Sequence, residues 1–259
     1  MVACFEGRSR LAPALSAWLG LIVAALSLVT PVRAAEGLYL AWDDCRSGSG
    51  VPNKAFACDA NDVVLDLFCA FQPPADFGVD VVGIEAVVDV QHSLPQLPDW
   101  WQMGFAGCRQ GELLANADFS AGGDCLDPWG GIAGAAEIQN YTVGTLSPSH
   151  ARIVAVAGVL AKNAVALDGD GIYYGVRIRF RSGHSAGTGS CSGCLAPACL
   201  VLNGITIRRL AGSPGGDPLM VTPGFSQSNW VTWRGGAGAD CMLVPTRAVT
   251  WGAVKTLYR

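Results

Sequence analysis

The densest cluster of reactive side chains in this sequence is a run of three cysteines within nine residues, Cys191, Cys194 and Cys199. The run lies in a Gly-, Ser- and Pro-rich loop that leads into an apolar, β-branched stretch. Together with Cys241 it offers four thiolates, and Cys-x-x-Cys is one arm of a zinc ribbon. The second arm is missing, however, and a catalytic dithiol would need a following helix, which Pro197 disfavours. We therefore expect structural disulfides here.

The cysteine count predicts one thiol without a partner inside the chain. Ten cysteines occur, and Cys4 lies in a segment that we expect to be removed. An odd number remains, so at least one thiol is free or pairs between chains. Cys69 is the candidate free thiol, because it lies on the apolar side of an alternating strand, where a thiol packs as a small hydrophobic side chain. The remaining cysteines are the disulfide candidates: Cys45, Cys58, Cys108, Cys125, Cys191, Cys194, Cys199 and Cys241.

Pairs between neighbours in the sequence are the simplest prediction for the connectivity. Two such pairs would close polar loops, namely Cys45–Cys58 and Cys108–Cys125. The last four cysteines have three connectivities, and the sequence does not distinguish between them. The connectivity that joins close neighbours is Cys199–Cys241 with Cys191–Cys194.

The segment Gly183–Gly187 matches the G-x-S-x-G nucleophile elbow and follows a predicted strand. That motif requires a helix next, and an acid and a histidine farther along the chain. A Gly/Ser loop follows instead, and no histidine occurs after His184. The sequence therefore predicts a loop. His92, His150 and His184 also lack the spacing of a histidine metal site.

Asp168 and Asp170, in Asp-Gly-Asp-Gly, resemble half of a calcium loop. A complete EF-type loop ends with a bidentate glutamate at its twelfth position, where this chain has Arg179. A tight turn between strands is the favoured interpretation. Weak Ca²⁺ binding at the two aspartates is the only cofactor that the sequence suggests.

Four tryptophans are the candidates for ligand binding, because flat aromatic rings suit sugar faces and partner chains. Trp100 and Trp101 are adjacent, and Trp230 and Trp233 differ in strand parity. If each pair lies on a regular strand, at most one member of each faces solvent and the other packs in the core. Core packing is the favoured interpretation for all four.

Period-two alternation of apolar residues predicts the strands that must position these groups. The predicted strands are 37–42, 62–71, 81–91, 152–158, 172–181, 199–209 and 228–233, with a strand end or helical turn at 160–167. In the fifth of these, Tyr174 is expected to face the core and Tyr173 the solvent. Strands 81–91 and 172–181 carry opposite outward charges, and if they share a sheet, Glu85 and Arg179 should couple across it.

The N-terminus predicts export. Arg8 and Arg10 precede an apolar stretch, and Val32-Arg33-Ala34 reads as a signal-peptidase site before Ala35; an uncleaved anchor is the alternative. Removal of residues 1–34 leaves 14 basic and 20 acidic residues, a net charge of −6. This acidity argues against a nucleic-acid partner, which favours a basic surface. No later apolar run is long enough for a membrane span.

We predict three segments: a signal peptide at 1–34, a β-sandwich domain at 35–245, and a C-terminal strap or short helix at 246–259. The fold class is all-β, an antiparallel sandwich of jelly-roll or cohesin-like type stapled by disulfides. The length suits one large β-domain, and the 33 glycines and 14 prolines favour strands and turns over helices.

The ending Thr250–Arg259 (TWGAVKTLYR) resembles the tail of uncharacterised secreted proteins from environmental bacteria. Those proteins also have a strand followed by a cysteine, like Leu40–Cys45, and a Gly-Ser-Cys-x-Gly-Cys loop, like Gly189–Cys194. The resemblance covers most of the chain after the signal peptide. It implies no chemistry, because that family has no assigned activity. More loosely, the strand order resembles cohesin-type and carbohydrate-binding sandwiches.

These observations lead us to expect an exported, non-enzymatic module for adhesion, assembly or glycan binding, outside the cell or at its surface, with the periplasm as an alternative. Its partner would be a polysaccharide or a cell-surface protein. The alternative is a carbohydrate-active hydrolase with paired carboxylates from Glu85, Glu112 or Asp89. Such a pair must lie roughly 5–9.5 Å apart across a cleft, and outward positions on separate strands disfavour it.

Overall fold

The computed structural model describes residues 37–45, 48–74, 79–120, 122–132, 134–221, 228–239 and 241. The predicted signal peptide and the predicted C-terminal strap lie outside these residues.

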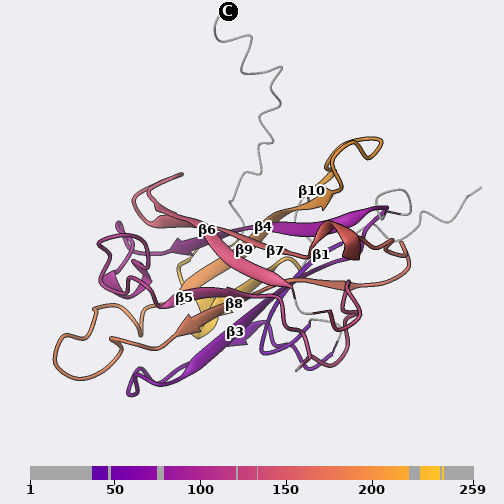
Figure 1. Ribbon diagram of the computed structural model, residues 1–259. Coiled ribbons are helices and arrows are strands. Elements are labelled where there is room, and N and C mark those ends of the chain that lie inside the picture. The colour runs from indigo at the N-terminus through magenta and orange to yellow at the C-terminus, as the bar shows by residue number, and fades with distance from the viewer. Residues whose placement is uncertain are drawn as a thin grey trace, which may run out of the picture. The chain divides into compact units, whose positions relative to one another are not determined.

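The described chain forms two packed β-sheets, as predicted (Figure 1). The four-stranded sheet has the order β1 (Leu38–Trp42), β3 (Val64–Phe71), β8 (Tyr173–Arg181), β5 (Leu113–Asn116). The seven-stranded sheet has the order β2 (Asn53–Lys54), β11 (Trp230–Trp233), β9 (Ala198–Arg209), β4 (Val81–His92), β7 (His150–Gly158), β6 (Ala135–Val143), and β10 (Leu219–Val221) also pairs with β9. All pairings are antiparallel except β11 with β2.

Helical structure is confined, in the described part of the chain, to three single 3-10 turns: η2 (Asp99–Trp101), η3 (Ala161–Asn163) and η4 (Arg234–Gly236). None of the helices among these residues has the length and apolar character needed to cross a membrane.

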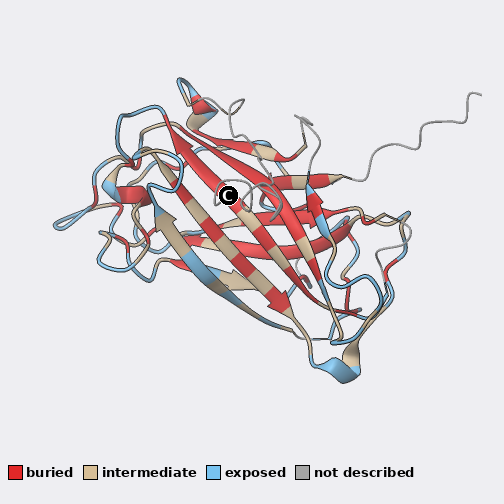
Figure 2. Cartoon of the chain, turned by 90° about the horizontal axis from the view of Figure 1, so that it is seen from above, coloured by how far each residue is buried: buried red, intermediate tan, exposed pale blue. Residues whose placement is uncertain are grey.

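Alternating side chains build the core between the sheets. β7 is the clearest case, since every second residue from Ala151 to Ala157 is buried. β4 and β9 differ, because they are buried almost continuously along their length (Figure 2). Their outward-facing side chains are therefore covered as well as their inward-facing ones.

A β-bulge reverses the expected orientation of two tyrosines. Between Cys69 and Ala70 the register with β8 shifts, so that Ala70 lies opposite Tyr174. The extra residue moves Tyr174 to the side of Phe68, with ring centroids 5.5 Å apart. Tyr174 is buried, although on the outward side of the sheet, and Tyr173 is buried beside Phe71, so the expectation that Tyr173 faces solvent was wrong. Strict alternation fails at a bulge.

The predicted coupling of Glu85 with Arg179 was also wrong. β4 and β8 belong to different sheets. Arg179 instead pairs with Asp66 on β3 at 2.9 Å, and Glu85 pairs with Arg208 on β9 at 2.6 Å. Charge complementarity across strands is present, but each residue finds its partner within its own sheet.

Four disulfides join segments that are distant in the sequence: Cys45–Cys125, Cys58–Cys194, Cys108–Cys191 and Cys199–Cys241. For the last four cysteines, whose pairing the sequence left open, Cys199–Cys241 forms and Cys191–Cys194 does not. The predicted pairs Cys45–Cys58 and Cys108–Cys125 were wrong, because loops at the same end of a sandwich come from strands far apart in the chain. The zinc alternative also fails, because all four of its proposed ligands are bonded in disulfides: Cys191, Cys194, Cys199 and Cys241.

Cys69 is free and fully buried, as predicted. Burial raises the pKa of its thiol, so it remains a protonated, apolar group. Four disulfides in one domain indicate an oxidising, extracytoplasmic environment.

Candidate functional site

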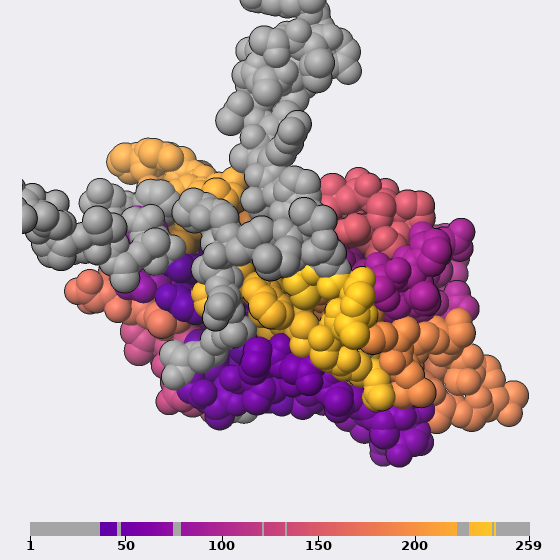
Figure 3. All heavy atoms as spheres, turned by 180° about the vertical axis from the view of Figure 1, so that it is seen from behind, coloured from indigo at the N-terminus to yellow at the C-terminus, as the bar shows by residue number. Residues whose placement is uncertain are grey.

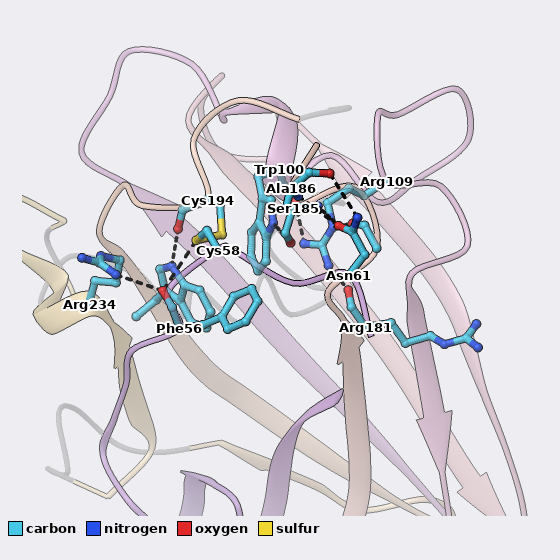
Figure 4. The surroundings of a disulfide bond; sticks show 12 residues. Phe56, Cys58, Asn61, Trp100, Arg109, Arg181, Ser185, Ala186, Cys194 and Arg234 are labelled. Carbon is cyan, nitrogen blue, oxygen red and sulfur yellow. Dashed lines mark hydrogen bonds between the residues drawn. A yellow bond between two sulfur atoms is a disulfide. The ribbon is translucent and has the colours of Figure 1, made fainter. Parts of the chain in front are cut away.

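Three segments meet at one end of the sandwich, and we call residues 56–62, 98–112 and 181–196 the loop cluster (Figure 4). They adjoin the start of β3 and the end of β8, which pair through Val64 and Arg181. Two disulfides, Cys58–Cys194 and Cys108–Cys191, tie the segments together. The cluster is therefore covalently fixed and well placed to hold side chains in a defined geometry.

The segment around β11 completes this end of the molecule. Trp233 Nε1 donates to the carbonyl of Cys194 at 2.8 Å, and Arg234 donates to the carbonyl of Phe56 at 3.0 Å. Figure 3 shows this segment, in yellow, against the N-terminal residues in indigo and the cysteine-rich loop in orange.

Arg109 organises the loop cluster from its centre. Its guanidinium is fully buried and lies 3.7 Å from the ring centroid of Trp100. It donates to three carbonyl oxygens, those of Trp100, Arg181 and Gly183. Burial lowers its pKa to about 10, a shift that the neighbouring Glu112 opposes. Arg109 thus remains charged at neutral pH, and its hydrogen bonds hold backbone rather than a ligand.

Three of the four candidate tryptophans do not reach solvent. Trp100, Trp101 and Trp233 have no exposed surface. Their rings pack on one another, with Trp100 and Trp233 stacked at 5.1 Å and Trp100 and Trp101 edge-on at 4.9 Å. The structure thus shows core packing, the favoured interpretation, for these three. Neither Trp100 nor Trp101 faces solvent, because they lie in a 3-10 turn, where neighbouring side chains do not alternate as in a strand.

Trp230 is the remaining candidate. It is partly exposed and lies opposite Val201, on the face of β9 that points away from the core. One partly exposed ring offers a much smaller platform for a sugar than the paired rings that the sequence suggested.

The G-x-S-x-G segment forms a loop, as predicted. Ser185 is buried, and its hydroxyl accepts a hydrogen bond from Trp100 Nε1 at 2.8 Å. Its backbone N–H donates to Asn61 Oδ1 at 2.8 Å. This serine therefore links two loops and does not serve as an exposed nucleophile.

The structure does not bring the candidate carboxylates together. Asp89 is fully buried, and its two oxygens each accept a hydrogen bond of 2.7 Å from Arg152. Glu85 is held by Arg208. Glu112 lies elsewhere, beside a hollow of about 380 Å³ that it lines with Arg181 and four other residues. The three carboxylates that the sequence suggested for a hydrolase, Glu85, Asp89 and Glu112, therefore do not form a facing pair.

Asp168 and Asp170 form a tight turn. The backbone N–H of Asp170 donates to Asp168 Oδ1 at 3.1 Å, and that of Gly171 donates to the Asp168 carbonyl. Among the residues that the structure describes, no three His, Cys, Asp or Glu side chains are grouped to hold a metal ion. Weak calcium binding at this turn stays a prediction.

An open hollow of about 650 Å³ lies beside β6 and the end of β7, and we call it the β6 groove. It was not predicted from the sequence. Its walls are mostly small or apolar: Gly134, Ala135, Ala136, Glu137, Val156, Ala157, Gly158, Val159, Leu160 and Asn163. Leu160 at its rim is 69% exposed. A Cβ at Gly134 would lie 2.8 Å from the Gly158 carbonyl, so the backbone approach here depends on glycine.

No protein-family model matches this chain, and no curated protein is similar to it in sequence.

Proposed function

We propose that this chain is an exported, non-catalytic module that binds another protein outside the cell or at its surface, in adhesion or assembly. The four disulfides support a place in an oxidising compartment. The way in which consecutive strands alternate between the two sheets supports a jelly-roll or cohesin-like sandwich. Such a fold hosts many functions, so the choice between them depends on the surface.

The observation that carries this proposal is the open edge of β6 beside the β6 groove. β6 is the last strand of its sheet, and in the described residues only β7 pairs with it. An edge strand offers unpaired backbone N–H and C=O groups to an added strand. The bulge between Ile138 and Asn140 divides this edge, and the half that begins at Ala135 lines the β6 groove.

The β6 groove suits an extended segment of a partner protein with small or apolar side chains at alternate positions. Glu137 lies in the β6 groove, and no described basic side chain forms an ion pair with it. A basic residue in the bound segment would complement this carboxylate. Glycan binding is less well supported, because three of the four tryptophans that could stack on sugars are buried.

A peptide-display selection against the oxidised chain from residue 35 onward tests this proposal, with a glycan array run in parallel. We expect selected peptides to alternate apolar residues with at least one Lys or Arg, and to bind Leu160→Asp at least tenfold more weakly. Leu195→Asp is the matched control, because Leu195 is also an exposed leucine but lies in the loop cluster.

Peptides that bind Leu160→Asp as well as the unchanged chain would overturn the β6 groove as the binding site. Hits on the glycan array without any selected peptide would overturn the protein partner. Release of reducing ends from a polysaccharide would overturn the non-catalytic character.

A further inference from the structure

Two opposite charges lie side by side where β3, β8 and β5 meet the loop cluster, and they do not pair. Arg181 lies opposite Val64 on β3, and its backbone N–H donates to the carbonyl of Glu112, the residue before β5. Opposite charges on neighbouring strands normally attract each other. Yet no ion pair joins Arg181 to Glu112 or to any other carboxylate among the described residues. Figure 4 shows the Arg181 side chain directed away from Arg109.

The next row of the same sheet has the ordinary arrangement. Two residues along β3 and β8, Asp66 lies opposite Arg179, and Arg179 Nε donates to Asp66 Oδ1 at 2.9 Å. At the strand ends, by contrast, the Glu112 carboxylate lies against Gly183, where an added Cβ would come within 2.5 Å of its Oε1. Burial lowers the pKa of Arg109, and the charge of Glu112 opposes this shift. The carboxylate is therefore held on the side of the buried guanidinium.

A hollow of about 380 Å³ lies beside these two unpaired groups, and we call it the charged hollow. Its lining combines one guanidinium, two carboxylates, an amide and two valines: Arg181, Asp62, Glu112, Asn61, Val63 and Val64. Val64 is 50% exposed, so its side chain is accessible from the hollow. Charges of both signs and an apolar surface thus border one space.

Backbone hydrogen bonds and the amide of Asn61 hold the walls of the charged hollow. The N–H of Val63 donates to Ser182 Oγ at 2.9 Å, and the N–H of Ser182 donates to the Val63 carbonyl at 2.8 Å. Asn61 Oδ1 accepts hydrogen bonds from the N–H groups of Ser185 and Ala186 at 2.8 and 2.9 Å. The two disulfides of the loop cluster tie the same segments together. Walls that are fixed before binding reduce the entropy cost of holding a ligand.

We propose that the charged hollow binds an α-amino acid with an aliphatic side chain, in its zwitterionic form. A guanidinium binds a carboxylate through two parallel hydrogen bonds, so Arg181 receives the α-carboxylate. Asp62 and Glu112 receive the α-ammonium group, which has three donors, and Val64 contacts the aliphatic side chain. This site goes beyond the proposed function and does not depend on the β6 groove.

Isothermal titration calorimetry of the oxidised chain from residue 35 onward with L-leucine tests the site. We expect a dissociation constant of about 1 mM or tighter, within reach of a few charge-assisted hydrogen bonds. N-acetyl-L-leucine lacks the ammonium group and L-leucinamide lacks the carboxylate. Each should bind at least roughly tenfold more weakly, the effect of one hydrogen bond to a charged group.

Arg181→Gln removes the guanidinium, and we expect it to weaken L-leucine at least roughly tenfold and to leave L-leucinamide unchanged. Its near-UV circular dichroism should match that of the unchanged chain, because no described hydrogen bond involves the Arg181 side chain. Arg179→Gln is the matched control, since it makes the same change in the next row, where the arginine is paired with Asp66. It should leave the binding of L-leucine unchanged.

Asp62→Asn tests the other end of the ligand and keeps the proposal testable if Arg181→Gln fails to fold. It should weaken L-leucine and leave N-acetyl-L-leucine unchanged. Equal binding of L-leucine to either variant and to the unchanged chain would overturn the proposal. So would equal binding of L-leucine and L-leucinamide, or no heat at concentrations about tenfold above the expected dissociation constant. None of these results would affect the β6 groove.

Discussion

The two outer faces of this sandwich are covered in different ways. Over the four-stranded sheet, the loop after β5 places Phe119 flat against Tyr174, with ring centroids 5.0 Å apart. Asp44 lies beneath this loop and accepts hydrogen bonds from Tyr174 and from the backbone of Gly123. Over the seven-stranded sheet, Trp230, Ala239 and Cys241 pack on Cys199 and Val201, and Gln91 and Asp89 lie buried opposite those two residues.

The difference shows what each cover requires. The loop over the four-stranded sheet brings its own aromatic ring and backbone donors, and the Cys45–Cys125 disulfide joins it to the end of β1. Arg177 on this face nevertheless has a buried Nε without a hydrogen-bond partner among the described residues. The face of β9 that carries Cys199 has the same kind of covalent joint, Cys199–Cys241, and on that face Gln91 Nε2 and Asn203 Oδ1 have no hydrogen-bond partner among the described residues. Substitutions on either face test this difference through their effect on the free energy of unfolding.

The largest effect is expected over the four-stranded sheet. Phe119→Ala should lower the free energy of unfolding by about 3–5 kcal/mol, the usual cost of removing a buried phenylalanine ring, because Phe119 is 3% exposed. Phe105→Ala is the control, since Phe105 is 94% exposed and should change stability little. Denaturant titration measures both. Equal effects would show that the loop is not part of the core.

Asp44→Asn should cost about 1–3 kcal/mol, because it weakens several hydrogen bonds to a buried carboxylate. Burial raises the pKa of Asp44, but hydrogen bonds from Tyr174, Cys45, Ser49 and Gly123 outweigh it and hold the pKa below the usual value. Burial and the bond to Asp44 raise the pKa of Tyr174 to about 12, which keeps it a donor.

This lowered pKa also predicts a pH dependence. The contribution of Asp44 is complete above its pKa in the unfolded chain, about 3.9, and is lost as the pH falls through the lower pKa of the folded state. The difference in stability between the unchanged chain and Asp44→Asn should therefore shrink under acid conditions. Asp59→Asn, at an exposed carboxylate, is the control and should show no such difference at neutral pH.

At Gln91, on the outward face of β4, the expected effect is smaller. Gln91→Leu should be neutral or slightly stabilising, because the buried amide Nε2 has no hydrogen-bond partner to lose. Denaturant titration against the unchanged chain measures the difference. A loss of about 1 kcal/mol or more, the net worth of one hydrogen bond, would show that this amide has a partner in the folded protein.

The smallest effect on stability is expected at Leu160, at the rim of the β6 groove. Leu160→Asp should change the free energy of unfolding by less than about 0.5 kcal/mol, as surface substitutions usually do, because the side chain is 69% exposed. A larger loss would mean that Leu160 stabilises the fold, and its effect on partner binding could then not be assigned to the β6 groove.

Alternation of apolar residues was sufficient to predict most long strands, the central β4 and β9 among them, because their apolar side chains are evenly spaced. It missed β6, whose apolar positions are partly filled by Ala135 and Ala136. It also gave the wrong side for Tyr173 and Tyr174, because a bulge adds one residue to the ladder and sequence periodicity carries no sign of it.

The candidate site was predicted less well than the fold. The identity of the bonded cysteines was predicted, but three of the four pairs depend on which loops meet in space, and that is a property of the sheet order. The burial of Trp100 and Trp101 depends on a 3-10 turn that places the Trp100 ring on Arg109 and the Trp101 ring against Trp233. The β6 groove arises from a missed strand, and glycine with small side chains at 134–136 was the one sequence signal that could have indicated it.

The central claim is that disulfides between loops distant in the sequence fix the two faces of this sandwich. Mass spectrometry of a non-reduced digest of the oxidised chain tests this most directly. We predict linked peptides for Cys45–Cys125 and Cys199–Cys241, together with Cys58–Cys194 and Cys108–Cys191, and a free thiol at Cys69. Linked peptides for Cys45–Cys58, or a Cys241 that is not bonded to Cys199, would contradict the account.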